Sequence, residues 1–199
     1  MRGNCPDYSI QPLNSETWNA FARLAEKHNG VWGGCWCTWF HRTAGEISQT
    51  ERSFESNRAF KESLVRSGRA HAALVFDGDA AVAWCAFGPP IEFPNIYHRK
   101  QYLAEQTTPL PDYRIPCFFV DRDYRRRGLA ARALDGALDL IAKEGGGVVE
   151  AYPHDTQGRK ANATFLYNAT RGLFEKAGFL YDRPKGQKNC VMRKTVLPG

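Results

Sequence analysis

The clearest pattern in the chain is helical and lies between residues 129 and 144. Alanine, leucine and isoleucine recur there at three- and four-residue spacing, while the charged side chains fall largely on the other side. Three glycines at 145–147 end the pattern. Helical spacing also predicts helices over 16–28 and 54–66. We expect a further short helix over 170–177.

Short apolar runs predict the strands of a sheet. A turn of Asp77, Gly78 and Asp79 joins the first two runs into a hairpin. A long polar and proline-rich connection over 89–112 is expected to be a functional or mobile loop. The strand–helix–strand order around residues 129–144 indicates a mostly parallel centre with antiparallel hairpins around it. The expected strands cover 70–76, 80–87, 114–120, 148–152, 179–182 and 190–195.

Composition narrows the class of protein. The chain has 199 residues, of which 43% are hydrophobic, and this suits one compact domain. No apolar run approaches the roughly 18 residues that span a bilayer, and the N-terminus lacks the apolar stretch of a secretory signal. Six cysteines without a CxxC pair indicate free thiols and no metal site. We therefore expect a cytoplasmic protein without a membrane partner.

A basic turn after residue 120 carries the candidate chemistry. The predicted strand ends at Val120, and the long helix begins near Gly128. The first amides of a helix lack partners within it, and together with the helix dipole they form a site for phosphate oxygens. Gly128 and Ala130 leave room for a diphosphate, and five arginines over 122–132 supply forked donors. The net charge of +6 also suits an anionic ligand.

Two segments resemble motifs of one enzyme family. Residues 125–130 read Arg-Arg-Arg-Gly-Leu-Ala, which is similar to the Arg/Gln-x-x-Gly-x-Gly/Ala signature of the GNAT N-acetyltransferase superfamily. Residues 173–179 read Leu-Phe-Glu-Lys-Ala-Gly-Phe, which resembles that family's Leu-Tyr-Glu-Lys-x-Gly-Phe turn. The resemblance covers about residues 7–196. It implies a single acetyltransferase domain over 1–199, with its signature region at about 114–182.

The fold class that the resemblance implies is α/β, in the mixed α+β sense. Its centre is a mixed twisted sheet of about six or seven strands with helices on both faces. Acetyl-coenzyme A is the implied co-substrate. Its pantetheine arm would lie against the strand at 118–120, and its pyrophosphate would lie on the turn at 125–130. The implied cofactor-binding residues are Phe118, Phe119, Val120, Arg125, Arg126, Arg127, Gly128, Leu129, Ala130 and Phe174.

The resemblance further implies transfer of an acetyl group to a primary amine by direct attack in a ternary complex. A small molecule is the expected acceptor, with a protein or peptide amine as an alternative. A non-catalytic sensor of acyl-coenzyme A is another. Nucleic acid is not expected as a partner, because the basic residues gather at one turn instead of along a face. Members of the family are often dimers, so a homodimer is compatible with the resemblance.

The catalytic residues are less evident than the turn. The family's usual acid is a tyrosine in the second motif, and Phe174 stands there instead, so Tyr152 and Tyr167 are the candidate acids. Each is also compatible with a core ring. Glu92 and Glu150 are the candidate bases. A salt bridge to one of the arginines is the structural alternative for Glu150.

A tryptophan-rich segment is the candidate acceptor site. Trp32, Trp36 and Trp39 lie where members of the family often wall that site, with Cys35 and Cys37 near its floor. Such a wall favours an apolar or cationic acceptor. The alternative is that the rings only fill the core beneath a loop.

Overall fold

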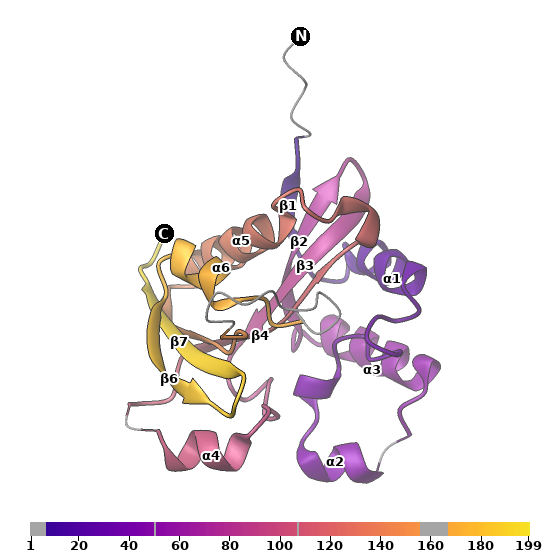
Figure 1. Cartoon of the computed structure of the whole chain (residues 1–199). Helices are drawn as coiled ribbons and strands as arrows, with labels where there is room; N and C mark the ends of the chain where they lie inside the picture. The colour runs from indigo at the N-terminus through magenta and orange to yellow at the C-terminus, as the bar shows by residue number, and fades with distance from the viewer. Residues whose placement is uncertain (1–6, 50, 107, 156–166) are drawn as a thin grey trace.

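The structure is a computed structural model that describes residues 7–49, 51–106, 108–155 and 167–199 (Figure 1). After one short strand the first part of the chain is helical, and strands and helices alternate later. The elements are β1 (Ser9–Pro12), α1 (Trp18–Lys27), a 3-10 turn (Trp39–His41), α2 (Ala44–Gln49), α3 (Phe54–Arg66), β2 (His71–Asp77), β3 (Ala80–Gly88), α4 (Arg99–Ala104), β4 (Tyr113–Val120), a second 3-10 turn (Arg122–Tyr124), α5 (Leu129–Lys143), β5 (Gly147–Ala151), α6 (Arg171–Lys176), β6 (Leu180–Lys185) and β7 (Asn189–Val196).

The described strands form one seven-stranded sheet in the order β1-β2-β3-β4-β5-β7-β6. This confirms the predicted mixed sheet with helices on both faces. The expectation of a mostly parallel centre was wrong, because β4 and β5 form the one parallel pair among the described strands. Their neighbours β3 and β7 each belong to a hairpin, and a hairpin brings its strand back antiparallel.

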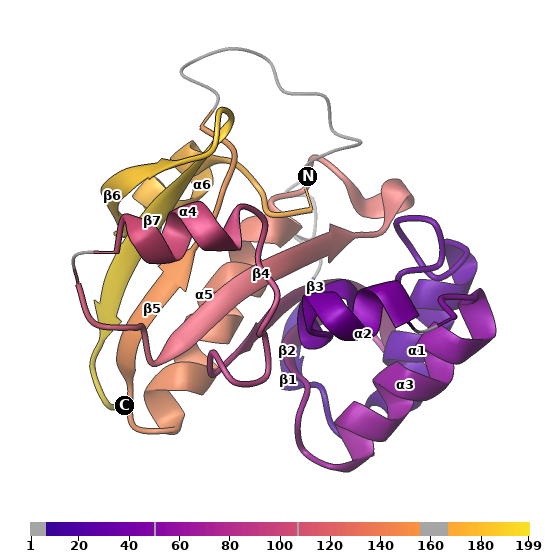
Figure 2. The same cartoon turned by 90° about the horizontal axis from the view of Figure 1, so that it is seen from below.

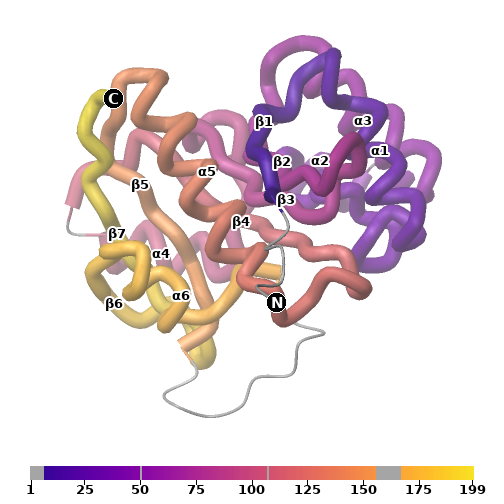
Figure 3. The backbone as a smooth tube through the Cα atoms, turned by 90° about the horizontal axis from the view of Figure 1, so that it is seen from above, coloured from indigo at the N-terminus to yellow at the C-terminus, as the bar shows by residue number. Residues whose placement is uncertain are grey.

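Helices cover the two faces unequally (Figures 1 and 2). α5 lies along one face, where Ala133, Leu134 and Ala137 are fully buried. α1 and α3 cover the other face near β2 and β3, and the rings of Phe21 and Trp84 meet there at 4.8 Å between centroids. The tube view separates these two helices from α4, α6 and the β6–β7 hairpin at the far edge (Figure 3). The sheet therefore has one core on each face.

The pairing of β4 with β5 is short. It covers only Tyr113, Arg114 and Ile115 on β4. Further along β4, the Phe118 amide donates to the Tyr167 carbonyl at 2.5 Å. At Phe118, Tyr167 therefore replaces β5 as the hydrogen-bonding neighbour of β4.

The elements absent from the sequence predictions are those without an apolar stripe. β1 has no buried residue, and neither has α2. α4 lies inside the connection expected to be a loop and buries only Tyr102. Because these elements bury almost no side chains, their sequences carry no periodic pattern of hydrophobic residues from which a helix or strand could be predicted.

A buried histidine joins α3 to the loop after β3. The Nδ1 atom of His41 lies 2.9 Å from the Glu92 carbonyl oxygen, and its Nε2 lies 3.1 Å from Nζ of the buried Lys61. A neutral ring satisfies both contacts, since Nδ1–H donates to the carbonyl and Nε2 accepts from lysine. Burial, assisted by Lys61, holds the pKa of His41 well below its ordinary value.

This arrangement predicts a pH dependence of stability. As the pH falls below about 6.5, His41 takes up a proton in the unfolded chain before it does so in the folded protein. The free energy of unfolding should therefore decrease as the pH falls from 7 to 5. His41→Gln should reduce this decrease in chemical denaturation, whereas His98→Gln, at an exposed position, should leave it unchanged. Equal pH profiles for wild type and His41→Gln would contradict the assignment.

Candidate functional site

The turn between β4 and α5 leaves the start of the helix open. Gly128 is the N-cap of α5, has a left-handed backbone with φ of +76°, and provides no side-chain cap. A Cβ atom built at this position meets no protein atom within 4 Å. The first amides of α5 therefore face open space, and free amides at a helix start bind anionic oxygen atoms.

A cavity of about 280 Å³ lies where β4, the turn and α5 meet. We call it the β4 pocket. Three residues at the end of β4 line it, together with residues from the turn and α5 and from the segment 167–170. Its lining is Trp32, Phe118, Phe119, Val120, Arg125, Ala130, Ala169, Thr170 and Leu173.

A second and larger cavity, of about 640 Å³, adjoins the first. We call it the aromatic pocket. Trp32 lines both cavities, and the rings of Trp39 and Tyr97 are stacked at 4.1 Å along the second. The lining of the aromatic pocket is Trp32, Gly33, Cys35, Cys37, Thr38, Trp39, Phe40, Arg42, Ile47, Arg52, Asn57, Tyr97, Cys117 and Tyr167.

Tyr167 lies beside the shared wall of the two pockets. Its ring centroid is 6.0 Å from that of Trp32 and 5.9 Å from that of Tyr97. Burial, and next the neighbouring Tyr97, raise the pKa of Tyr167 far above its ordinary value. The phenol therefore keeps its proton at neutral pH.

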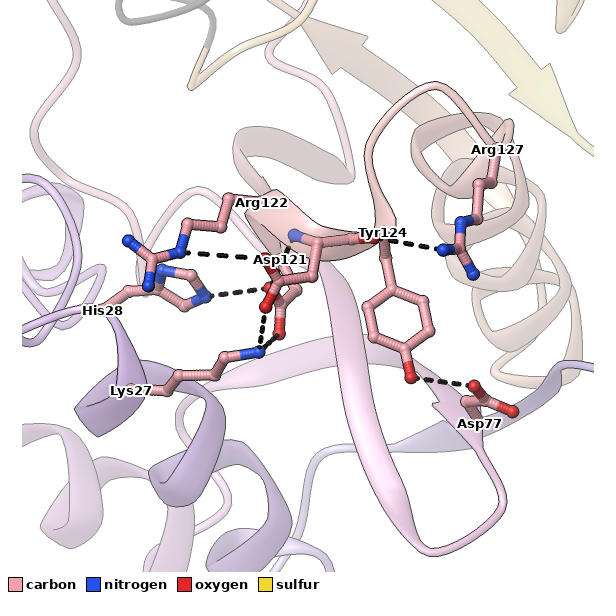
Figure 4. A network of polar contacts seen from close by, with 8 residues as sticks. Lys27, His28, Asp77, Asp121, Arg122, Tyr124 and Arg127 are labelled. Carbon is pink, nitrogen blue, oxygen red and sulfur yellow. Dashed lines mark hydrogen bonds and ion pairs between the residues drawn. The ribbon is translucent and has the colours of Figure 1, made fainter.

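A buried carboxylate holds the beginning of the turn (Figure 4). Asp121 accepts from Lys27 Nζ at 2.8 Å and from the Asp123 amide at 3.0 Å, and its Oδ1 lies 3.2 Å from His28 Nε2. Burial acts to raise the pKa of Asp121, but the bonds from Lys27 and Asp123 outweigh burial and lower it. This cluster ties the end of α1 to the end of β4, just before the open helix start.

The rest of the turn is bound on its other side. The Tyr124 hydroxyl donates to Asp77 at 2.8 Å, and the Arg127 guanidinium lies 4.9 Å from the Tyr124 ring centroid (Figure 4). Arg127 also donates to the Asp123 carbonyl at 3.2 Å. These contacts use Arg127 to hold the turn in shape.

A comparison with protein families matches residues 35–179 to the acetyltransferase (GNAT) family. The chain belongs to the GNAT family. It is therefore an acyltransferase whose acetyl donor is acetyl-coenzyme A, as the motifs at 125–130 and 173–179 implied. No curated protein matches the sequence significantly.

Solved GNAT structures share the fold over nearly the whole chain. A GNAT protein from Desulfovibrio desulfuricans is 14% identical, with a TM-score of 0.53 and coverage of 96% of this chain and 99% of that one. The PaiA N-acetyltransferase of Thermoplasma acidophilum, in complex with coenzyme A, is 14% identical, with a TM-score of 0.51 and coverage of 95% and 99%. An acetyltransferase from Thermus thermophilus is 15% identical, with a TM-score of 0.50 and coverage of 94% and 96%.

The residues expected to bind the cofactor fall into three groups. Those that line the β4 pocket are Phe118, Phe119, Val120, Arg125 and Ala130. Arg126, Arg127 and Gly128 form the turn without lining the pocket. Leu129 and Phe174 lie in the core on the α5 face, where the Phe174 ring meets that of Phe118 edge-on at 5.7 Å.

The three tryptophans separate into two roles. Trp32 and Trp39 line the aromatic pocket. Trp36 is completely buried and packs against Trp18 and Phe54. Since Trp32 and Trp36 both adopt left-handed backbone, the buried ring of Trp36 anchors a strained loop that presents Trp32 to the pockets.

The structure brings none of the other catalytic candidates to the described lining of either pocket. Glu150 is fully buried, accepts from the Tyr102 and Tyr152 hydroxyls, and pairs with Arg193 at 3.1 Å. Glu92 lies 3.2 Å from His71. These contacts match the structural alternative for Glu150.

Several lining residues were not anticipated from the sequence. They are Thr38, Phe40, Arg42, Ile47, Arg52, Asn57 and Tyr97. Tyr97 comes from the connection between β3 and α4, and the others come from α2, α3 and the segments beside them. No local spacing there distinguishes a pocket residue from a surface one. In the part of the chain that the structure describes, no three His, Cys, Asp or Glu residues form a metal-binding group. None of the described helices has the length and apolarity to cross a membrane.

Removing the Asp121 charge should loosen the junction of α1 and β4. Asp121→Asn should lower the free energy of unfolding by about 1–3 kcal/mol, because it removes a buried, hydrogen-bonded carboxylate that pairs with Lys27. The matched control is Asp123→Asn, whose carboxylate also pairs with Lys27 but is 58% exposed. It should cost no more than about 1 kcal/mol in the same denaturation experiment. Equal effects would mean that Asp121 does not hold the junction.

The open helix start should be sensitive to a side chain. Gly128→Leu should lower the affinity for coenzyme A at least about tenfold in calorimetry, because the new side chain occupies the space before the amides. Gly145→Leu is the control, since Gly145 follows the opposite end of α5, also has a positive φ and also faces open space. It should bring similar backbone strain without loss of affinity. Unchanged binding in Gly128→Leu would place the diphosphate elsewhere.

Proposed function

We propose that this protein, as one acetyltransferase domain, moves an acetyl group from acetyl-coenzyme A to the primary amine of a small molecule. The transfer is a direct attack by the amine in a ternary complex. The observation that carries the proposal is the pair of adjoining pockets with Trp32 as their common wall. Two cavities in contact allow both substrates to be bound at once.

The β4 pocket fits acetyl-coenzyme A. The amides at the start of α5 and the side chain of Arg125 suit its phosphates, and the apolar side chains of Phe118, Phe119 and Val120 suit its pantetheine arm. The bound co-substrate supplies the acetyl group as a thioester. The open space before Gly128 supports this fit independently of the family's motif.

Tyr167 is the proposed general acid. Phe174 stands at the usual tyrosine position and is buried without a proton to give. Tyr167 precedes the first helical residue of α6, Arg171, so a non-helical segment and not the helix places its hydroxyl. The phenol lies at the shared wall and carries a proton at neutral pH, so it can donate that proton to the leaving thiolate.

The acceptor amine has no carboxylate base among the described residues of the aromatic pocket. We therefore assign its deprotonation to solvent, before the amine enters. A cavity of about 640 Å³ is of the size that small ligands occupy, and this favours a small acceptor over a protein amine.

Loss of the Tyr167 hydroxyl should lower the rate and not the binding. Tyr167→Phe should reduce kcat by about 10²-fold or more and leave the KM for acetyl-coenzyme A unchanged, because the ring remains and only the proton is lost. The control is Tyr97→Phe, which removes a hydroxyl from the ring next to Tyr167 and should lower kcat no more than about fivefold. Release of the coenzyme A thiol gives both rates. A Tyr167→Phe enzyme as fast as wild type would exclude Tyr167 as the acid.

A further inference from the structure

Arg42 is a buried cation in the wall of the aromatic pocket. Its residue is only 6% exposed, and its guanidinium carbon lies 3.9 Å from the Phe60 ring centroid. A long contact of 3.5 Å joins its Nη2 to the Asn57 side-chain oxygen. Its Nε is buried and has no hydrogen-bond partner in the described structure.

The charge of Arg42 is not balanced by a carboxylate in contact. Among the described residues, none forms an ion pair with it within 4.0 Å. Glu46 acts on Arg42 from a distance, but its carboxylate is exposed and caps α2 by accepting from the Thr43 amide at 2.6 Å and the Thr43 hydroxyl at 2.8 Å. An arginine stays charged in a protein, and a buried charge without a partner is costly.

A second arginine faces the same cavity. Arg52 lines the aromatic pocket and is exposed, and its charge is close enough to act on Arg42. The described lining contains no Asp or Glu. Both arginines line this pocket and not the β4 pocket.

From this geometry we infer that the acceptor is an amino carboxylic acid, whose carboxylate binds Arg42 and Arg52 and whose amine points toward Trp32 and Tyr167. The inference rests on the proposed function and names its substrate class. Guanidinium groups bind carboxylates through paired, charge-assisted hydrogen bonds, and the orphan Nε of Arg42 is one free donor. The stacked rings of Trp39 and Tyr97 suit an apolar body between the two ends. A purely cationic acceptor, which the tryptophans alone favoured, is disfavoured by the two arginines.

Matched pairs of amines test the carboxylate directly. Phenylalanine is compared with phenethylamine, and 6-aminohexanoate with hexylamine, at saturating acetyl-coenzyme A. Thiol release gives the rate, and mass spectrometry identifies the acetylated product. In at least one pair, the carboxylated member should have a kcat/KM at least about tenfold higher, because only it engages the guanidinium groups.

Variants test the two arginines. Arg52→Gln should lower kcat/KM for the preferred amino acid about tenfold. The kcat/KM for the matching amine without a carboxylate and the KM for acetyl-coenzyme A should stay unchanged. Arg42→Gln should have a larger effect, and Arg52→Gln keeps the test valid if that buried variant does not fold. Arg23→Gln, on the exposed side of α1, is the control and should match wild type.

The outcomes separate this inference from the proposed function. Turnover of the simple amines as fast as their carboxylated partners would overturn the inference and leave the acetyltransfer intact. Preference for phosphoethanolamine over every amino acid would also overturn it. If no amine is acetylated, calorimetry with the coenzyme A-saturated protein decides. If the wild type binds the amino acids and Arg52→Gln does not, the carboxylate site is supported and the proposed function fails. If the wild type does not bind them, both are overturned.

Discussion

The short pairing of β4 with β5 is the constraint on which the site depends. Three residues of β4 pair with β5, and further along the strand the Phe118 amide bonds to the Tyr167 carbonyl instead. That exchange of neighbours places Tyr167 beside the end of β4, and it puts Ala169 and Thr170 in the wall of the β4 pocket. The β4 pocket therefore lies where the neighbour of β4 changes.

Much of the fold and the turn could be predicted from the sequence because their signals are local. The stripe of α5 and the runs of β2 to β5 reflect faces that pack against one another, and Gly128 follows from the backbone that the turn needs. Trp36 and Trp39 show what local sequence patterns cannot predict, namely which of two similar residues is buried in the core and which lines a pocket. They are the same residue type three positions apart, and contacts with residues distant in the sequence, among them Trp18 and Phe54, bury the first.

The polar residues follow the same rule. Glu150 occupies a strand position where a catalytic carboxylate could also stand. In the structure its charge is paired with that of Arg193 on the neighbouring strand β7. Arg42 has no carboxylate in contact, because the nearby Glu46 accepts from the Thr43 amide at the start of α2 instead. Whether a charge is structural or available to a ligand depends on which partner the tertiary fold delivers, and no spacing in the sequence records that.

Trp32 carries a consequence for how the two substrates influence each other. Its side chain is 36% exposed and forms a wall of both cavities, so a ligand that shifts the indole in one cavity reshapes the other. Under the proposed function, in which each cavity binds one substrate, the two binding equilibria are then thermodynamically linked. By reciprocity, whatever factor the acyl donor applies to the affinity for the acceptor, the acceptor applies to the affinity for the donor. The indole of Trp32, as the wall common to both cavities, would then couple the affinity for one substrate to the affinity for the other.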